Sequence, residues 1–77
     1  MTEVSEPTPE TIYYGSGAVQ AKGSMLDGVP HGAWEWFRKD GTLMRTGQFD
    51  RGTQFGIWRT FERSGHLVKE TRFKARR

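Results

Sequence analysis

The side chains that could carry acid–base or metal chemistry are few in this sequence and stand far apart. Its two histidines each adjoin a glycine, His31 before Gly32 and His66 after Gly65, at positions where the rest of the chain carries non-polar or hydroxyl side chains. The chain has no cysteine, which excludes thiolate nucleophiles and cysteine zinc sites, and it contains no Gly-x-Ser-x-Gly or phosphate-loop pattern. We therefore expect no catalytic residue, metal site, cofactor or small-molecule substrate, and predict that the protein is not an enzyme.

Aromatic and basic side chains are much more numerous, and they favour binding chemistry. Three Trp, five Phe and two Tyr occur in 77 residues, and such rings bury large areas and are enriched at interfaces. All twelve Lys and Arg, but only six of the nine acids, follow residue 10, so this part of the chain carries a net charge of +6. A basic surface with aromatic side chains could bind nucleic acid or anionic lipid.

The sequence repeats itself at an interval of 24 residues. Six residues recur identically after one interval: Gly32, Trp34, Phe37, Gly41, Leu43 and Phe49 become Gly56, Trp58, Phe61, Gly65, Leu67 and Phe73. A weaker copy precedes them, which divides the chain into units of about residues 8–31, 32–55 and 56–77. Repeats of this length typically bury their apolar residues only against neighbouring units.

Each unit has the signature of a β-hairpin. In the second unit, residues 34–38 and 42–46 are β-prone, and the turn between them is Lys39-Asp40-Gly41. Glycine reaches the positive φ that such a turn requires, and Gly17 and Gly65 hold the same place in the other units. The sequence predicts an all-β fold, a single antiparallel twisted meander of three hairpins with about six strands. Residues 27–32 and 50–56 are predicted as loops between the hairpins.

Alternation along the strands predicts which residues share a face. Counting from the turn places Phe37 opposite Leu43 and Trp36 opposite Met44. One face, the predicted core, then carries Tyr13, Val19, Met25, Ala33, Phe37, Leu43, Phe49, Ile57, Phe61, Leu67 and Phe73. The opposite face is mixed and includes Ile12, Tyr14, Trp34, Trp36, Met44, Trp58 and Val68.

Two glycines fall in the middle of predicted strands, where glycine normally weakens pairing. Such glycines often mark a close approach to the backbone by another group. We expect the indoles of Trp34 and Trp58 to pack flat against Gly23 and Gly47 respectively.

The spacing resembles the MORN repeat family in its bacterial variant, which is sometimes labelled antitoxin-like. The similarity covers about residues 12–73, and its pattern is Gly32-x-Trp34-x-x-Phe37, Gly41-x-Leu43, Phe49-x-x-Gly52 and Gly56-x-Trp58. It implies a non-enzymatic β-repeat module for protein interaction, for scaffolding near membranes or for binding anionic lipid. The first unit departs from the pattern, since Glu10 stands where Trp would be, and we expect this unit to be a cap.

The ends of the chain differ in composition from the repeats. Residues 1–10, with Pro7, Pro9 and three glutamates, are predicted as a disordered acidic arm, residues 11–74 as the repeat domain and residues 75–77 as a basic tail. No signal peptide or membrane span is apparent. We expect a cytoplasmic location, with attachment to a membrane surface as the alternative.

Positions where the units differ are the candidates for function. Trp36 corresponds to Ile12 and Thr60, so the repeat does not require Trp there. Two interpretations are open for Tyr14, Trp36 and Met44: an exposed patch that binds another protein, or a second small core under a coiled sheet. That partner could also be a second copy, paired through the outer strands. The alternative hypothesis is that anionic lipid or nucleic acid binds the basic cluster of Arg72, Lys74, Arg76 and Arg77.

Overall fold

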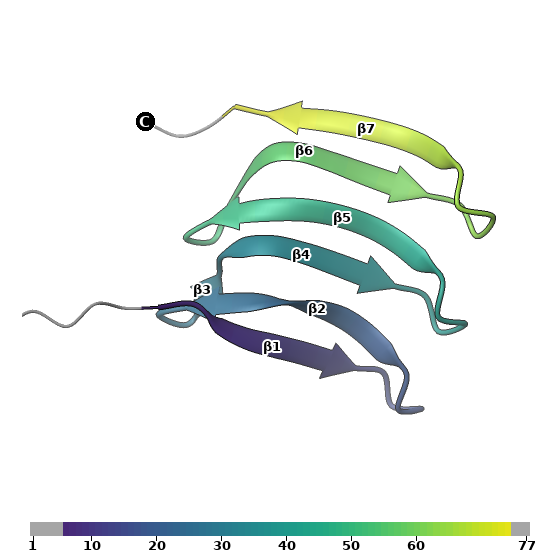
Figure 1. The fold of residues 1–77 in the computed structure, drawn as a ribbon, viewed down its shortest axis with the longest axis horizontal. Helices are drawn as coiled ribbons and strands as arrows, with labels where there is room; N and C mark the ends of the chain where they lie inside the picture. Colours follow the sequence, from purple (N-terminus) through teal and green to yellow (C-terminus); the bar gives the residue numbers. More distant parts are fainter. Residues whose placement is uncertain (1–5, 75–77) are drawn as a thin grey trace, which may run out of the picture.

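The computed structural model describes residues 6–74, which form one antiparallel β-sheet and contain no helix (Figure 1). The strands are β1 (Thr8–Tyr13), β2 (Val19–Leu26), β3 (Val29–Pro30), β4 (Gly32–Phe37), β5 (Leu43–Asp50), β6 (Thr53–Phe61) and β7 (Leu67–Phe73). Their order in the sheet is β1-β2-β4-β5-β6-β7, and the two-residue β3 pairs with β2. The predicted all-β antiparallel meander is confirmed.

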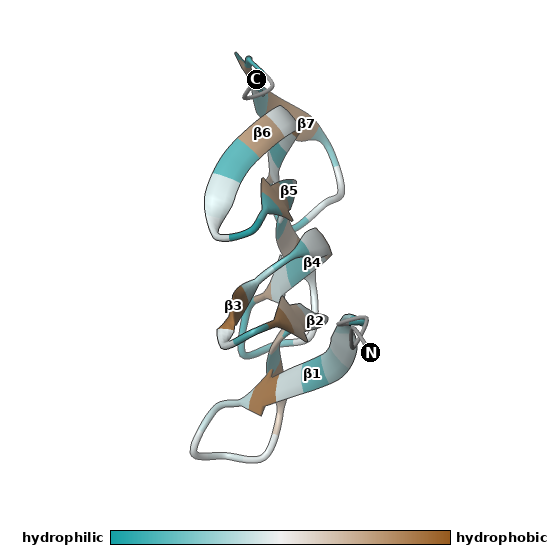
Figure 2. Cartoon of the chain, turned by 90° about the vertical axis from the view of Figure 1, so that its left-hand side faces the viewer, coloured by the Kyte–Doolittle hydropathy of each residue, from teal (hydrophilic) through white to brown (hydrophobic). Residues whose placement is uncertain are grey.

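The sheet is a single layer with two open faces. Its principal extents are 50 × 31 × 13 Å, and Figure 2 shows that no second layer of the described chain covers either face. Sheets usually bury one face against another element. Here the sheet must supply its own core from the side chains that lie across its strands.

The three hairpin turns are closed by glycines, as predicted. Gly17, Gly41 and Gly65 have φ values of 99°, 91° and 96°. In the second hairpin the Gly41 amide donates to the Arg38 carbonyl, and the Arg38 amide donates to the Thr42 carbonyl, both at 2.9 Å. Equivalent hydrogen bonds occur in the first and third hairpins, so the three turns have the same geometry.

The connections between hairpins are two-residue turns, and the predicted loops of residues 27–32 and 50–56 are wrong. Leu26 pairs with Val29 and Asp50 with Thr53, so strand pairing continues up to each turn. Both turn residues have positive φ, at 51° and 84° in one turn (Asp27-Gly28) and at 49° and 88° in the other (Arg51-Gly52). These are the angles of a type I′ turn, which favours Asn or Asp followed by Gly.

Arg51 is therefore in a conformation that suits asparagine better. We expect Arg51→Asn to raise the free energy of unfolding by about 0.5–1 kcal/mol, because Asn tolerates a left-handed backbone. Urea denaturation would measure the change. The same side chain at Gln54, an exposed position with ordinary φ, should give no gain, and an equal gain at both positions would contradict the explanation.

The core does not lie where the alternation predicted. Ala21, Trp34 and Trp58 are the buried hydrophobic residues of the described chain, whereas Tyr13 is 59% and Leu67 48% exposed. The predicted core face is wrong because each hairpin contains a β-bulge whose extra residue is Gln20, Met44 or Val68.

A bulge shifts the alternation of every residue beyond it. Phe37 pairs with Leu43 as predicted, but Trp36 pairs with Arg45, so the predicted pairing of Trp36 with Met44 is wrong. The same shift brings Phe49 and Phe73 to the face that carries the tryptophans.

Strand β1 begins at Thr8, earlier than the predicted start of the domain at residue 11. Pro9 lies opposite Ser24 in the pairing of β1 with β2. An outer strand tolerates proline because the amides on its free side need no ladder partner. Residues 8–10 of the predicted acidic arm are thus part of the sheet. Residues 1–5 of that arm and the predicted basic tail of residues 75–77 lie outside the described residues.

Candidate functional site

Aromatic rings form a continuous row across one face of the sheet, the aromatic face, made up of Trp34, Trp36, Phe49, Trp58 and Phe73. Trp36 stacks between Trp34, at 6.0 Å, and Trp58, at 5.3 Å between ring centroids. Phe49 meets all three tryptophans edge to face, and Phe73 meets Trp58 in the same way at 6.1 Å. The row connects β4 to β7 and serves as the core of the sheet.

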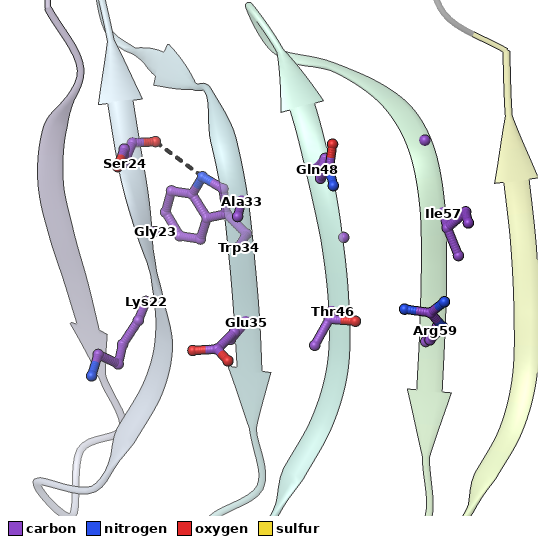
Figure 3. A pocket seen from close by; sticks show the side chains of 12 residues that line it. Lys22, Gly23, Ser24, Ala33, Trp34, Glu35, Thr46, Gln48, Ile57 and Arg59 are labelled. Atoms are coloured by element: carbon purple, nitrogen blue, oxygen red, sulfur yellow. Dashed lines mark hydrogen bonds between the residues drawn. The ribbon is translucent and has the colours of Figure 1, made fainter.

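The two buried indoles lie against strand glycines, which confirms the predicted packing. A Cβ built on Gly23 would be 2.0 Å from Cδ2 of Trp34, and one on Gly47 would be 2.3 Å from Cδ2 of Trp58. The Trp34 indole donates a hydrogen bond to the Ser24 carbonyl at 3.0 Å (Figure 3). One repeat later, the Trp58 indole donates to the Gln48 carbonyl at 3.2 Å.

Trp36 belongs to this core, so its packing favours the interpretation of a small core on this face over that of an exposed patch. Its ring is half-buried between those of Trp34 and Trp58 and meets the edge of Phe49. The repeat has Thr60 at the equivalent place, but the stacked rings of the neighbouring strands make Trp36 part of the packing. Its main role is therefore to join the units.

Tyr14 and Met44, the other two residues of the predicted patch, also take part in holding the sheet together. The Tyr14 hydroxyl donates to the Phe37 carbonyl at 2.7 Å, and Lys39 Nζ lies 5.6 Å from the Tyr14 ring centroid. Arg38 holds the same place one repeat later, and its guanidinium donates to the Phe61 carbonyl. Met44 is the extra residue of a bulge. Tyr14 and Arg38 thus link each hairpin to the next.

The opposite face, the polar face, has a shallow hollow of about 670 Å³. Cross-strand partners form a row across it with alternating charges: Lys22, Glu35, Thr46, Arg59 and Glu70 (Figure 3 shows the first four). Arg59 and Glu70 form an ion pair at 3.2 Å, with both side chains about 40% exposed. Two cations and two anions balance along the row, so the row itself has no net charge.

Positive charge without ion-pair partners in residues 6–74 also lies on the aromatic face, at two residues that the sequence analysis did not predict as a site. Arg45 and Lys69 are the cross-strand neighbours of Thr60, and all three line a small hollow of about 170 Å³ beside Trp58 and Phe73. Within residues 6–74, neither Arg45 nor Lys69 forms an ion pair. The repeat could have revealed these two cations, because Arg45 and Lys69 lie 24 and 48 residues after Ala21, which is buried.

The predicted basic cluster is only partly described. Arg72 and Lys74 are exposed, and Arg72 is the cross-strand partner of Ile57. Arg76 and Arg77 lie outside the described residues. The described half of the cluster adds to the charge of β7, at one edge of the sheet.

The two outer strands expose apolar side chains. Ile12 and Tyr13 of β1 are 42% and 59% exposed, and Leu67 and Val68 of β7 are 48% and 56% exposed. Outer strands also present backbone amides and carbonyls that have no partner strand among residues 6–74, and both features favour pairing with another chain.

His31, His66 and Asp40 make hydrogen bonds or close polar contacts at the turns of the sheet. His31 Nδ1 accepts a hydrogen bond from the Arg51 amide at 3.0 Å, which ties two neighbouring turns together, and His66 lies 3.0 Å from the Ser64 hydroxyl. Hydrogen bonds from Thr42 lower the pKa of the Asp40 carboxyl below its usual value. The described residues contain no group of three or more His, Asp or Glu side chains placed to hold a metal ion.

A search of protein-family models, curated proteins and solved structures finds no match to this chain. Across residues 6–74, the structure has no helix whose length and apolar character would allow it to cross a membrane.

Proposed function

We propose that this chain is a non-enzymatic, MORN-like β-repeat module for protein–protein interaction, and that its outer strands bind the partner. The observation that supports this most is the exposure of Ile12 and Tyr13 on β1 and of Leu67 and Val68 on β7. The aromatic face is largely used as core, so the open edges are the stronger candidates for contact. The resemblance of the sequence to MORN repeats supports a scaffolding role, and the sequence favours the cytoplasm as its location.

Addition of a strand explains how such an edge would bind. Backbone hydrogen bonds to an extended segment of the partner supply affinity, while side chains on alternate sides supply specificity. The exposed apolar residues would then become cross-strand neighbours of the partner's side chains.

A second candidate function is the binding of anionic lipid or nucleic acid. It is favoured by Arg45 and Lys69, which flank Thr60 without ion-pair partners in the described chain. Neutralising phosphates in this way would make binding strongly dependent on salt.

A pull-down from the native host with quantitative mass spectrometry separates the two functions. We expect Ile12→Lys or Val68→Lys to reduce recovery of a specific protein about fivefold or more, because each change removes apolar contact at an outer strand. The matched control is Val29→Lys, which alters an exposed apolar residue of β3, away from the outer strands.

The other outcomes also discriminate. Binding that is unchanged by both edge variants but is lost with Arg45→Glu, with nuclease or with added salt would overturn the protein-binding proposal in favour of the polyanion. Recovery that no variant alters would contradict both.

A further inference from the structure

The outer strands are equivalent to strands that pair inside the sheet. Within the sheet, Ala21 pairs with Trp36 and Lys22 with Glu35 where β2 meets β4. One repeat later, Arg45 pairs with Thr60 and Thr46 with Arg59 where β5 meets β6. The register between units is therefore conserved over a 24-residue shift. Strand β7 is the next in the series after β2 and β5, and β1 is the equivalent of β4 and β6.

We infer that the partner of the outer strands is a second copy of this chain, added head to tail so that β1 of one copy pairs with β7 of the next. This inference rests on the proposed function and names its partner. Extending the internal register by one more repeat places Ile12 opposite Lys69, Thr11 opposite Glu70 and Glu10 beside Thr71. Antiparallel pairing at Thr11 and Ile12 would satisfy the outward backbone groups there, and Pro9, which has no amide hydrogen, lies beyond these two pairs.

The charges of the two edges are complementary. Residues 6–14 contain two acids, Glu6 and Glu10, and no base, whereas residues 66–74 contain three cations and one acid. In the extended register Lys69 and Glu10 lie diagonally on the aromatic face, within reach of long side chains. Opposite charges of this kind favour the head-to-tail contact and disfavour pairing of two β7 edges.

The apolar side chains agree with the same arrangement. Exposed Ile12 and Tyr13 of one copy would lie along the strand that carries exposed Leu67 and Val68 in the next. Where β2 meets β4, the residues equivalent to Ile12 and Lys69 are Trp36 and Ala21, which are cross-strand partners. A second copy would thus cover the apolar residues that the outer strands leave in water.

The junction differs from the internal contacts in ways that make it weaker and reversible. Inside the sheet, Trp34 and Trp58 pack on Gly23 and Gly47, but the junction would bring Glu10 beside Thr71. Tyr14 and Arg38 each donate to the next unit, whereas Glu62 at the equivalent position lies against Ser64 of its own turn. The junction therefore keeps the strand register and replaces the buried indole with polar groups.

A head-to-tail contact uses different surfaces on the two copies, so it does not close on itself unless the rotation per copy completes a ring. The expected product is a series of oligomers whose size grows with concentration. The contact should weaken with salt, because charge attraction contributes to it.

Disulfide trapping tests the register directly, because the chain has no cysteine of its own. Equal amounts of two full-length variants, Thr11→Cys and Glu70→Cys, are mixed and oxidised, and the linked dimers are identified by mass. These residues are equivalent to the internal pairs Glu35 with Lys22 and Arg59 with Thr46. Opposite residues of paired strands are close enough for a disulfide, so we expect mixed dimers well above the statistical proportion. The pair Ile12→Cys and Lys69→Cys should behave in the same way.

The control pair is Thr11→Cys with Thr71→Cys, whose side chains would point to opposite faces and should not link above the statistical proportion. Linking at that proportion for every pair would overturn the head-to-tail register. Predominant dimers of one variant with itself would overturn it in favour of a symmetric edge contact.

Charge reversal gives a second measurement that needs no cysteine. Lys69→Glu should weaken association in sedimentation velocity about fivefold, and Glu10→Lys in the same chain should restore it. Failure of the double variant to recover would contradict the predicted ion pair. If trapping fails while Val68→Lys still loses a partner in the pull-down, the head-to-tail inference falls and the proposed function stands. If both fail, the proposed function falls as well.

Discussion

Replacing Gly47 by alanine is expected to lower the free energy of unfolding by about 2–3 kcal/mol, although the change adds a single methyl group. The new Cβ would lie 2.3 Å from Cδ2 and 2.4 Å from Cε2 of Trp58, far inside any tolerated contact. Either the indole or the strand must move.

The indole has little freedom to move. Trp58 is 7% exposed, and its Nε1 is hydrogen bonded to the carbonyls of Gln48 and Phe55, both at 3.2 Å. Moving it would also disturb its stacking on Trp36. Alanine normally favours the folded state slightly, because it restricts the unfolded chain, but that gain of under about 1 kcal/mol is smaller than the cost of the clash.

Urea denaturation of the two variants Gly47→Ala and Gly15→Ala provides the measurement with its matched control. A Cβ on Gly15 would have no neighbour within 4 Å, and the φ of Gly15 is not positive. Gly15→Ala should therefore stay within about 0.5 kcal/mol of the parent. Equal effects of the two substitutions would show that the indole does not hold the backbone as described.

Trp58→Ala is expected to cost about 3–5 kcal/mol, the range for deletion of a large buried ring. The residue stacks on Trp36, meets Phe49 and Phe73 edge to face, and covers Gly47. Since a domain of this size has on the order of 3–5 kcal/mol of stability, we expect the variant to be largely unfolded.

Trp36→Ala provides the comparison, because this ring is half-buried and makes no hydrogen bond within the described chain. We expect a loss of about 1–3 kcal/mol from its two stacked contacts and its edge contact with Phe49. Circular dichroism during thermal unfolding would rank parent, Trp36→Ala and Trp58→Ala in that order of decreasing stability. A Trp36→Ala variant as stable as the parent would return Trp36 to the exposed binding role that the sequence predicted.

Local patterns of the sequence predicted the hairpins well. The turn glycines, the pairing of Phe37 with Leu43 and the packing of Trp34 on Gly23 all follow from spacing within one repeat or between adjacent repeats. Each depends on backbone geometry that glycine makes available, and the positions of the glycines can be read directly from the sequence.

The assignment of faces failed because bulges leave no clear mark in the sequence. Gln20, Met44 and Val68 are chemically unlike each other, yet each is the extra residue of a bulge. The single residue added at each bulge exchanges the faces of everything beyond it. Phe49 consequently joins Trp36 and Trp58, and the exposed patch predicted around Trp36 becomes core.

The tight turns between hairpins were missed for a different reason. Arg51 is an unusual residue at positive φ, so Arg51-Gly52 lacks the Asn-Gly or Asp-Gly signature of a type I′ turn. Asp27-Gly28 carries that signature. Because Arg51-Gly52 lies 24 residues later, at the equivalent place of the next repeat, the first turn could have predicted the second.

The candidate site emerges where one repeat stops resembling the next. At the positions equivalent to Glu10, Thr71 and Glu62, the other repeats have a tryptophan, a glycine and a residue that donates a hydrogen bond to the following unit, respectively. All three changes fall at the two edges where a further unit would be added. We propose that they tune a contact between copies, since the edges retain exposed apolar residues and opposite charges.

The decisive measurement is the oxidised mixture of Thr11→Cys and Glu70→Cys variants. We expect disulfide-linked dimers that contain one chain of each kind, in clear excess over the statistical proportion and fewer at high salt. Mixed dimers at the statistical proportion, matched by the out-of-register pair Thr11→Cys and Thr71→Cys, would contradict head-to-tail pairing.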